Sequence, residues 1–179
     1  MRHFKKLSAL FLLCAAILCG CTQSNIVSPT GGTVEGPAVP DVETRDNVEI
    51  DWSEVNQAVR DEFMEPYGPY GDYVMDMAVS YDAASKTMTV LLPVTAKTTG
   101  EIAVSYGEAV LKVCGDELAT QDFSYEPSDE DQLYYGSFFD ENNVVVQIFP
   151  FNTQDDKSTY LVNDTMKAGE QRALVALTK

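Results

Sequence analysis

The feature that most constrains the fold is a segment with helical periodicity at residues 51–63, followed by segments with strand-like alternation. Asp51 and Glu54 have the spacing of a capping box at its start. Pro66 lacks the backbone N–H that a helix interior needs and ends the run. The segment therefore predicts an amphipathic helix with one apolar side. That side consists of Trp52, Val55, Val59 and Phe63.

A second amphipathic helix is predicted between Thr98 and Gly115. Thr98 and Glu101 repeat the capping-box spacing, and Gly115 is the expected C-terminal cap. Cys114 lies beside the apolar stripe, so we expect a buried, unreactive thiol. The stripe consists of Ile102, Tyr106, Ala109, Val110 and Val113.

Several further segments have the alternating or β-branched pattern of strands. Residues 82–86 and 140–143 are rich in turn-forming residues and have the length of hairpin connections. Each is therefore expected to join two antiparallel strands. The strands are predicted at residues 73–81, 87–94, 118–125, 133–139, 144–151 and 171–177, with a weaker candidate at 159–162.

This order contains hairpins but no strand–helix–strand alternation. It predicts an α+β fold, a two-layer sandwich in which two helices pack on one face of an antiparallel sheet. We expect residues 48–179 to form a single globular domain of this kind. Its core is expected to contain Trp52, Val55, Phe63, Val90, Ile102, Val110, Val146 and Phe149.

The first 21 residues have the organisation of an export signal. Three positive residues precede the apolar stretch Leu7–Leu18, which is too short to span a bilayer. The stretch ends in Leu18-Cys19-Gly20-Cys21, which resembles the lipobox of bacterial lipoproteins, although alanine or serine is commoner where Cys19 stands. The resemblance implies that residues 1–20 are a signal peptide, which is removed just before Cys21.

The resemblance also implies that the thiol of Cys21 carries a diacylglyceryl group. Residues 21–47 are rich in Thr, Ser, Gly and Pro and lack periodicity, so we expect them to form a flexible tether after the lipid. The protein is then expected on the extracytoplasmic side, anchored in the cell membrane or, in a cell with two membranes, in the outer membrane. Thr22 is compatible with outer-membrane sorting.

Charge and composition exclude several classes of function. The chain has 12 basic and 28 acidic residues and a net charge of −16, which becomes −19 when the leader and its three positive residues are lost. Such a chain repels nucleic acids and anionic headgroups, so we expect no nucleic-acid partner. The sole histidine, His3, lies in the leader, so the mature chain can supply neither a serine–histidine mechanism nor a histidine-ligated zinc site. Cys114 is left as the only unmodified cysteine, which excludes an intramolecular disulfide.

Two acidic clusters, at residues 129–131 and 155–156, are candidates for cation sites. Neither has the alternating oxygen ligands and the glycine of a calcium loop, so we expect solvated loops, no metal and no cofactor. Paired carboxylates also serve glycosidases, which leaves a small hydrolase as an alternative. No nucleophile or phosphate-loop motif accompanies the acidic residues.

Three tyrosines are the candidate ligand-binding residues. Tyr67, Tyr70 and Tyr73 recur every third residue through a turn-rich segment. Tyrosine rings with polar tips suit surfaces that bind sugars or peptides. The alternative is a tight connection whose tyrosines close the edge of the core.

Together these observations favour a lipid-anchored protein of the cell envelope that binds a partner or ligand, such as an envelope protein or a carbohydrate, and is not an enzyme. Two alternatives stay open. One is a small carboxylate-dependent hydrolase of an envelope polymer, and the other is a structural subunit of an envelope complex. The sequence predicts the location more narrowly than the activity.

Overall fold

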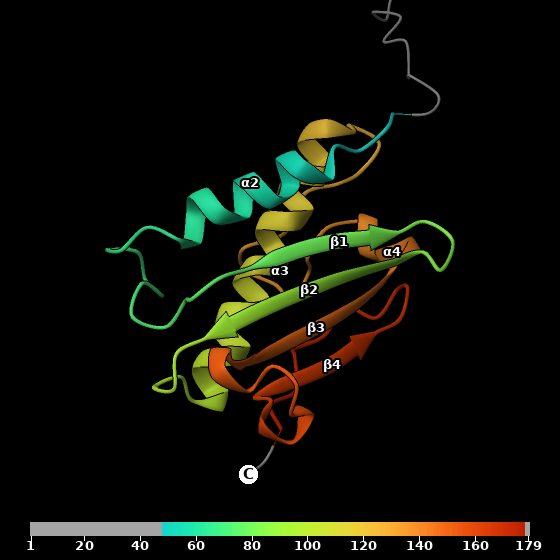
Figure 1. The fold of residues 1–179 in the computed structure, drawn as a ribbon. Coiled ribbons are helices and arrows are strands. Elements are labelled where there is room, and N and C mark those ends of the chain that lie inside the picture. Colours follow the sequence, from blue (N-terminus) through green and yellow to red (C-terminus); the bar gives the residue numbers. More distant parts are fainter. Residues whose placement is uncertain (1–47, 178–179) are drawn as a thin grey trace, which may run out of the picture. The chain divides into compact units, whose positions relative to one another are not determined.

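A computed structural model describes residues 48–177 of the chain. The predicted signal peptide, Cys21 and the tether lie outside the described residues. Figure 1 shows the arrangement of the described elements. In chain order these are α2 (Trp52–Phe63), β1 (Ala78–Asp82), β2 (Thr87–Val94), α3 (Gly100–Gln121), α4 (Phe138–Glu141), β3 (Asn143–Pro150), the 3₁₀ helices η1 (Phe151–Thr153) and η2 (Lys157–Thr159), and β4 (Val162–Met166).

The sheet has the strand order β1-β2-β3-β4 and is mixed. β1 pairs with β2, and β3 with β4, in antiparallel fashion, but β2 and β3 run parallel. The prediction of a fully antiparallel sheet is therefore wrong at its centre. α3 lies between these two strands in the chain, so β2–α3–β3 is a strand–helix–strand crossover that the sequence pattern did not reveal. The α+β class itself is confirmed.

The parallel pairing of β2 and β3 was not predicted because two of the predicted strands between them do not exist. Residues 118–125 begin inside α3, where Leu118 and Ala119 are buried on the helix, and α3 ends only at Gln121. Residues 133–139 form a turn that leads into α4 rather than a strand. Short apolar runs of this kind do not distinguish a strand from a buried helix or loop.

Gly115 lies inside α3 and is not its C-terminal cap. A Cβ atom at this position would overlap the carbonyl oxygen of Tyr135. The helix therefore passes in contact with the backbone of the loop that precedes α4, and only glycine permits that approach. This contact replaces the helix-ending role that the sequence predicts for Gly115.

The two predicted helices start close to the expected residues. Asp51 is the N-cap of α2, and its side chain accepts hydrogen bonds from the backbone of Ser53 (2.8 Å) and Glu54 (3.4 Å). The N-cap of α3 is Thr99, one residue after the predicted Thr98. Capping signals thus placed both helix starts to within one residue.

The core lies between the sheet and the helices. Figure 1 shows α3 behind the sheet and α2 beside β1. Side chains of β2 alternate between buried and half-buried, as expected for a sheet with one covered face. Of the predicted core residues, Trp52 and Ile102 are only half-buried. The others are buried: Val55, Phe63, Val90, Val110, Val146 and Phe149.

Both edges of the sheet are covered. α2 lies against β1, and the segment after β4 lies against β4. Residues 171–177 do not form the predicted strand, because they make only one isolated bridge, between Ala176 and Val162, and a hydrogen bond from the amide of Leu177 to the carbonyl of Leu161 (2.8 Å). Covered edges cannot pair with strands of other chains.

Candidate functional site

The three tyrosines predicted as ligand-binding residues have different surroundings. Tyr67 is almost fully exposed. Tyr70 packs against the rings of Phe63 and Tyr106, and its hydroxyl is 2.8 Å from that of Ser105. Tyr73 is half-buried. None of the three lines either of the two hollows described below. Tyr70 thus closes the margin of the core, as in the alternative interpretation of this segment.

Tyr106 is the most unusual of the buried tyrosines. Its side chain is fully buried, and its hydroxyl has no hydrogen-bond partner among the described residues. Burial is the main reason that its pKa is raised, and the nearby Asp76 and Tyr70 add to the effect. Tyr106 therefore stays protonated under physiological conditions and supplies no base.

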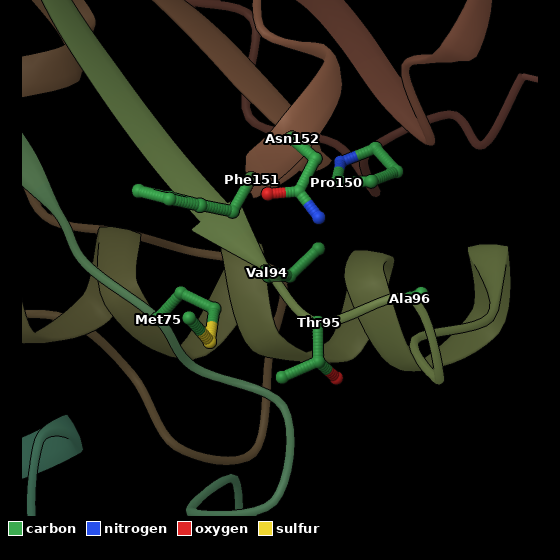
Figure 2. A pocket seen from close by; sticks show the side chains of 7 residues that line it. All are labelled: Met75, Val94, Thr95, Ala96, Pro150, Phe151 and Asn152. Atoms are coloured by element: carbon green, nitrogen blue, oxygen red, sulfur yellow. The ribbon is translucent and has the colours of Figure 1, made fainter.

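A small hollow lies where β2 and β3 end (Figure 2). We call it the strand-end hollow, and its volume is about 210 Å³. Because β2 and β3 are parallel and Val94 is in register with Pro150, their carboxyl ends meet at the same edge of the sheet. The hollow is lined by Met75, Val94, Thr95, Ala96, Pro150, Phe151 and Asn152.

Backbone hydrogen bonds fix the walls of this hollow. The amide of Met75 donates to the carbonyl of Pro93 (3.1 Å), and the amide of Thr95 donates to the carbonyl of Tyr73 (2.8 Å). Val94 is fully buried. Figure 2 shows Val94 between Met75 and Thr95 on one side and the Pro150–Asn152 segment on the other. The side chains of Met75 and Phe151 remain substantially exposed at the surface.

The hollow offers apolar surface and one side-chain amide, on Asn152, that is free to form hydrogen bonds. The hydroxyl of Thr95 donates to the carbonyl of Asp72 (3.2 Å). The carboxamide of Asn152 makes no hydrogen bond within residues 48–177 and points into the space above Val94 in Figure 2. The lining contains no ionisable side chain. Chemically, this arrangement can bind an apolar group and hydrogen-bond a polar group beside it, but it supplies no general acid or base.

A second, more open hollow is acidic. Its volume is about 480 Å³, and it is lined by Ser124, Tyr125, Glu126, Ser137, Asp140 and Glu141. Asp140 accepts a hydrogen bond from the side-chain amide of Gln171 (2.8 Å). The pKa of Tyr125 is raised by burial and by nearby carboxylates, so its ring presents a neutral hydroxyl.

The acidic clusters noted in the sequence serve their own loops. Asp129 accepts a hydrogen bond from the amide of Asp131 (2.9 Å), and Asp156 caps η2 by accepting from the amide of Ser158 (3.0 Å). In the part of the chain that the structure describes, no group of three or more Cys, His, Asp or Glu side chains is arranged to hold a metal ion. Within the same part, no helix has the length and apolarity required to cross a membrane.

Sequence reasoning missed the strand-end hollow because its residues come from three separate stretches of the chain. They meet only because β2 and β3 are parallel neighbours, and an antiparallel sheet would place their ends apart. Comparison with protein-family models, curated proteins and solved structures found no match. The residues of the hollow itself are therefore the basis for a functional hypothesis.

Proposed function

We propose that this chain is a lipid-anchored protein of the cell envelope whose domain binds a partner or ligand and catalyses no reaction. The observation that carries the binding role is the strand-end hollow, where two large apolar side chains, Met75 and Phe151, are exposed beside an uncommitted amide on Asn152. Exposed apolar side chains that surround a concave site are typical of interaction surfaces.

The composition of the hollow favours binding over catalysis. Its lining contains no carboxylate, amine, thiol or imidazole, and its one hydroxyl, on Thr95, is already a hydrogen-bond donor. Acid–base or nucleophilic catalysis needs at least one such group within reach of the substrate. An apolar partner segment needs none of them.

The anchor rests on the sequence around Cys21. One acyl chain holds a protein at a membrane only marginally, whereas two chains hold it stably, and a diacylglyceryl group supplies two. The charge of −19 on the mature chain works against adsorption to anionic lipid, so attachment depends on the lipid rather than on the protein surface.

Mass spectrometry of the N-terminus tests the anchor. We expect the mature chain to begin at a lipid-modified Cys21, and Cys21→Ser to remain unprocessed at this site. A mature chain that begins at any other residue would contradict the proposal.

Site-specific photo-crosslinking in intact cells tests the binding role. A photoreactive residue at position 151 should give a discrete cross-linked product, and the same residue at position 175 should not. Val175 is a matched control because it is comparably exposed and apolar but does not line the hollow. Equal products at the two positions, or none at 151, would count against a binding site at the hollow.

The acidic hollow is the observation that favours the alternative of a small hydrolase, because Glu126, Asp140 and Glu141 line one open cavity. Incubation of the purified chain with isolated envelope polymer distinguishes the two functions. A binding protein releases no soluble sugar. A hydrolase releases sugar, and the Glu126→Gln and Glu141→Gln variants reduce the release.

A further inference from the structure

We propose that the strand-end hollow accepts one large aliphatic or aromatic side chain from a basic protein partner, and that Asn152 hydrogen-bonds the peptide group next to that side chain. The inference deepens the proposed function and rests on it. It names the class of partner, a protein, and the group that the partner inserts.

The size of the hollow indicates a single side chain. Its volume of about 210 Å³ is comparable to that of one large apolar residue. Pockets for small molecules or cofactors usually enclose about 300–1,000 Å³. Protein interfaces, by contrast, concentrate their affinity in a few anchor side chains that fill well-packed pockets near the centre of the contact.

The walls combine a fixed base with an adaptable rim. Val94 is fully buried at a strand end, and Pro150 has a restricted backbone in the register-paired strand. Met75 and Phe151 are 45% and 51% exposed, so an inserted side chain would cover apolar surface on both. Methionine is unbranched and polarisable and adjusts to side chains of different shape. This arrangement fits either an aliphatic or an aromatic group.

Asn152 supplies the polar part of the recognition. A carboxamide has both donor and acceptor atoms, which match the N–H and C=O of a peptide unit. Because the Asn152 carboxamide makes no hydrogen bond within the described chain, it is available to an extended peptide whose side chain enters the hollow. An isolated hydrocarbon, such as a lipid chain, has no group that could hydrogen-bond this amide.

The start of the described chain argues against the tether as the occupant. Asp51 is hydrogen-bonded to Gln121 (2.7 Å), at the last turn of α3, whereas the hollow lies next to the segment that leads into the first turn of α3. A helix of 22 residues is about 33 Å long, so the two sites lie at opposite ends of it. The described chain therefore starts at the end of α3 opposite to the hollow.

Charge argues against a second copy and for a basic partner. Two copies of a chain with a net charge of −16, or −19 without its leader, repel one another. A partner with basic residues around its apolar anchor is instead attracted, and this attraction weakens with salt.

The test is a methyl NMR titration of the intact lipidated chain in phospholipid nanodiscs with labelled methionine methyl groups. The probes are N-acetyl-phenylalaninamide and N-acetyl-leucinamide, with N-acetyl-alaninamide as the small-side-chain control. We expect the Met75 signal to shift and to saturate at roughly 1–10 mM with the two large probes. Met64 is an internal control, because it is 39% exposed and does not line the hollow.

Three variants separate specific from general effects. Phe151→Asp should abolish the Met75 response, whereas Val175→Asp, at a residue of 57% exposure, should keep it. Asn152→Ala should weaken probe binding about two- to tenfold, as the loss of one hydrogen bond predicts. Unchanged signals from the buried Met77 and Met88 would show that each variant is folded.

Charged peptides test the basic partner. N-acetyl-Lys-Phe-Lys-amide should bind at least about threefold more tightly than N-acetyl-Glu-Phe-Glu-amide at low salt, and the difference should shrink at high salt. Equal affinities would overturn the basic character of the partner.

Any of four results would contradict the proposal that a partner side chain occupies the hollow. Two of them are the absence of a Met75 shift with the large probes and equal shifts at Met75 and Met64. A Met75 shift on dilution of the protein alone would indicate a second copy as the occupant, and a Met75 shift on deletion of residues 22–40 would indicate the tether. The proposed function is tested separately, by the lipid-modified N-terminus at Cys21 and by the cross-linked product at position 151, and none of these four results decides either measurement.

Discussion

The side-chain carboxamide of Asn56 hydrogen-bonds both backbone groups of Val79: its oxygen accepts from the amide of Val79 (2.7 Å), and its nitrogen donates to the carbonyl of Val79 (2.6 Å). Asn56 lies on α2 and Val79 on the edge strand β1. The carboxamide thus takes the place of a peptide unit of a neighbouring strand. Arg60, one turn later, donates to the carbonyl of Met77 (3.0 Å). The helix thereby satisfies a sheet edge that is otherwise open to other strands.

Replacement of Asn56 by alanine tests this relationship. We expect Asn56→Ala to lower the free energy of unfolding by about 1–3 kcal/mol, because two backbone groups of Val79 lose their partner. Urea unfolding followed by circular dichroism measures the change. We also expect concentration-dependent association in size-exclusion chromatography, because the edge of β1 is then uncovered.

Gln57 provides the control for Asn56. Its side-chain amide donates a hydrogen bond to Asp61, four residues away on the same exposed helix side (2.6 Å), and to no strand of the described chain. Gln57→Ala should therefore change the free energy of unfolding by less than about 0.5 kcal/mol. If the two variants unfold at the same urea concentration, Asn56 does not stabilise the edge of β1.

Local signals in the sequence were sufficient to predict α2, the start of α3 and the first hairpin. Asp51 and Pro66 bracket α2, and residues 82–86 overlap the turn between β1 and β2. Caps, turns and periodicity depend on neighbouring residues and can be identified without knowledge of the rest of the fold. The α+β class follows from them.

Long-range contacts were not predictable in this way. The central parallel pair depends on the continuation of α3 past Gly115 to Gln121. The low helix propensity of glycine suggests instead that the helix ends at Gly115. The contact with Tyr135 overrides the propensity, and nothing near Gly115 in the sequence indicates it. The strand-end hollow was missed for the same reason, since it exists only where β2 and β3 run parallel.

Because of the contact at Gly115, we expect the addition of one methyl group there to lower the free energy of unfolding strongly. Gly115→Ala places its Cβ atom against a backbone oxygen, which cannot move aside as a flexible side chain would. We expect a loss of about 3 kcal/mol or more in the free energy of unfolding, or failure to fold. Thermal or urea unfolding of the purified chain measures the loss.

Gly100→Ala is the control for Gly115. Gly100 begins α3, and a Cβ atom there meets only the Cβ of Ala176, at 3.2 Å. We expect a change within about 1 kcal/mol, because the better helix propensity of alanine offsets a tight side-chain contact. A loss for Gly115→Ala no larger than this would show that the helix and the loop can separate at little cost.

The thiol of Cys114 should be unreactive in the folded chain. Cys114 is fully buried on α3, and burial raises its pKa to about 12. At pH 8 only about one thiol in 10⁴ is then ionised, and the reagent is also excluded. We expect iodoacetamide to modify Cys114 at pH 8 in urea but not in buffer, as measured by mass spectrometry. Rapid modification without denaturant would contradict this burial.

The ion pair between Asp164 and Arg172 should make stability depend on pH. Asp164 accepts two hydrogen bonds from the guanidinium of Arg172 (2.8 and 3.0 Å) and one from the amide of Val175 (2.9 Å). The Arg172 hydrogen bond is the main reason that the pKa of Asp164 is lowered from the usual 3.8. A carboxyl whose pKa is lower in the folded state stabilises the fold above its ordinary pKa, and this stabilisation disappears as the pH falls through the lowered value.

Asp164→Asn should therefore cost about 1–3 kcal/mol at pH 7, and the difference from the unmodified chain should narrow below about pH 4. Asp76 is the matched control, because it forms an ion pair of the same length with Arg60 (2.8 Å) but its side chain is 52% exposed, against 12% for Asp164. Solvent screens the exposed pair, so Asp76→Asn should cost less than about 1 kcal/mol. Urea unfolding between pH 2.5 and 7 measures both. A cost for Asp164→Asn that persists unchanged at pH 2.5 would mean that its hydrogen bonds, and not its charge, hold the C-terminal segment against β4.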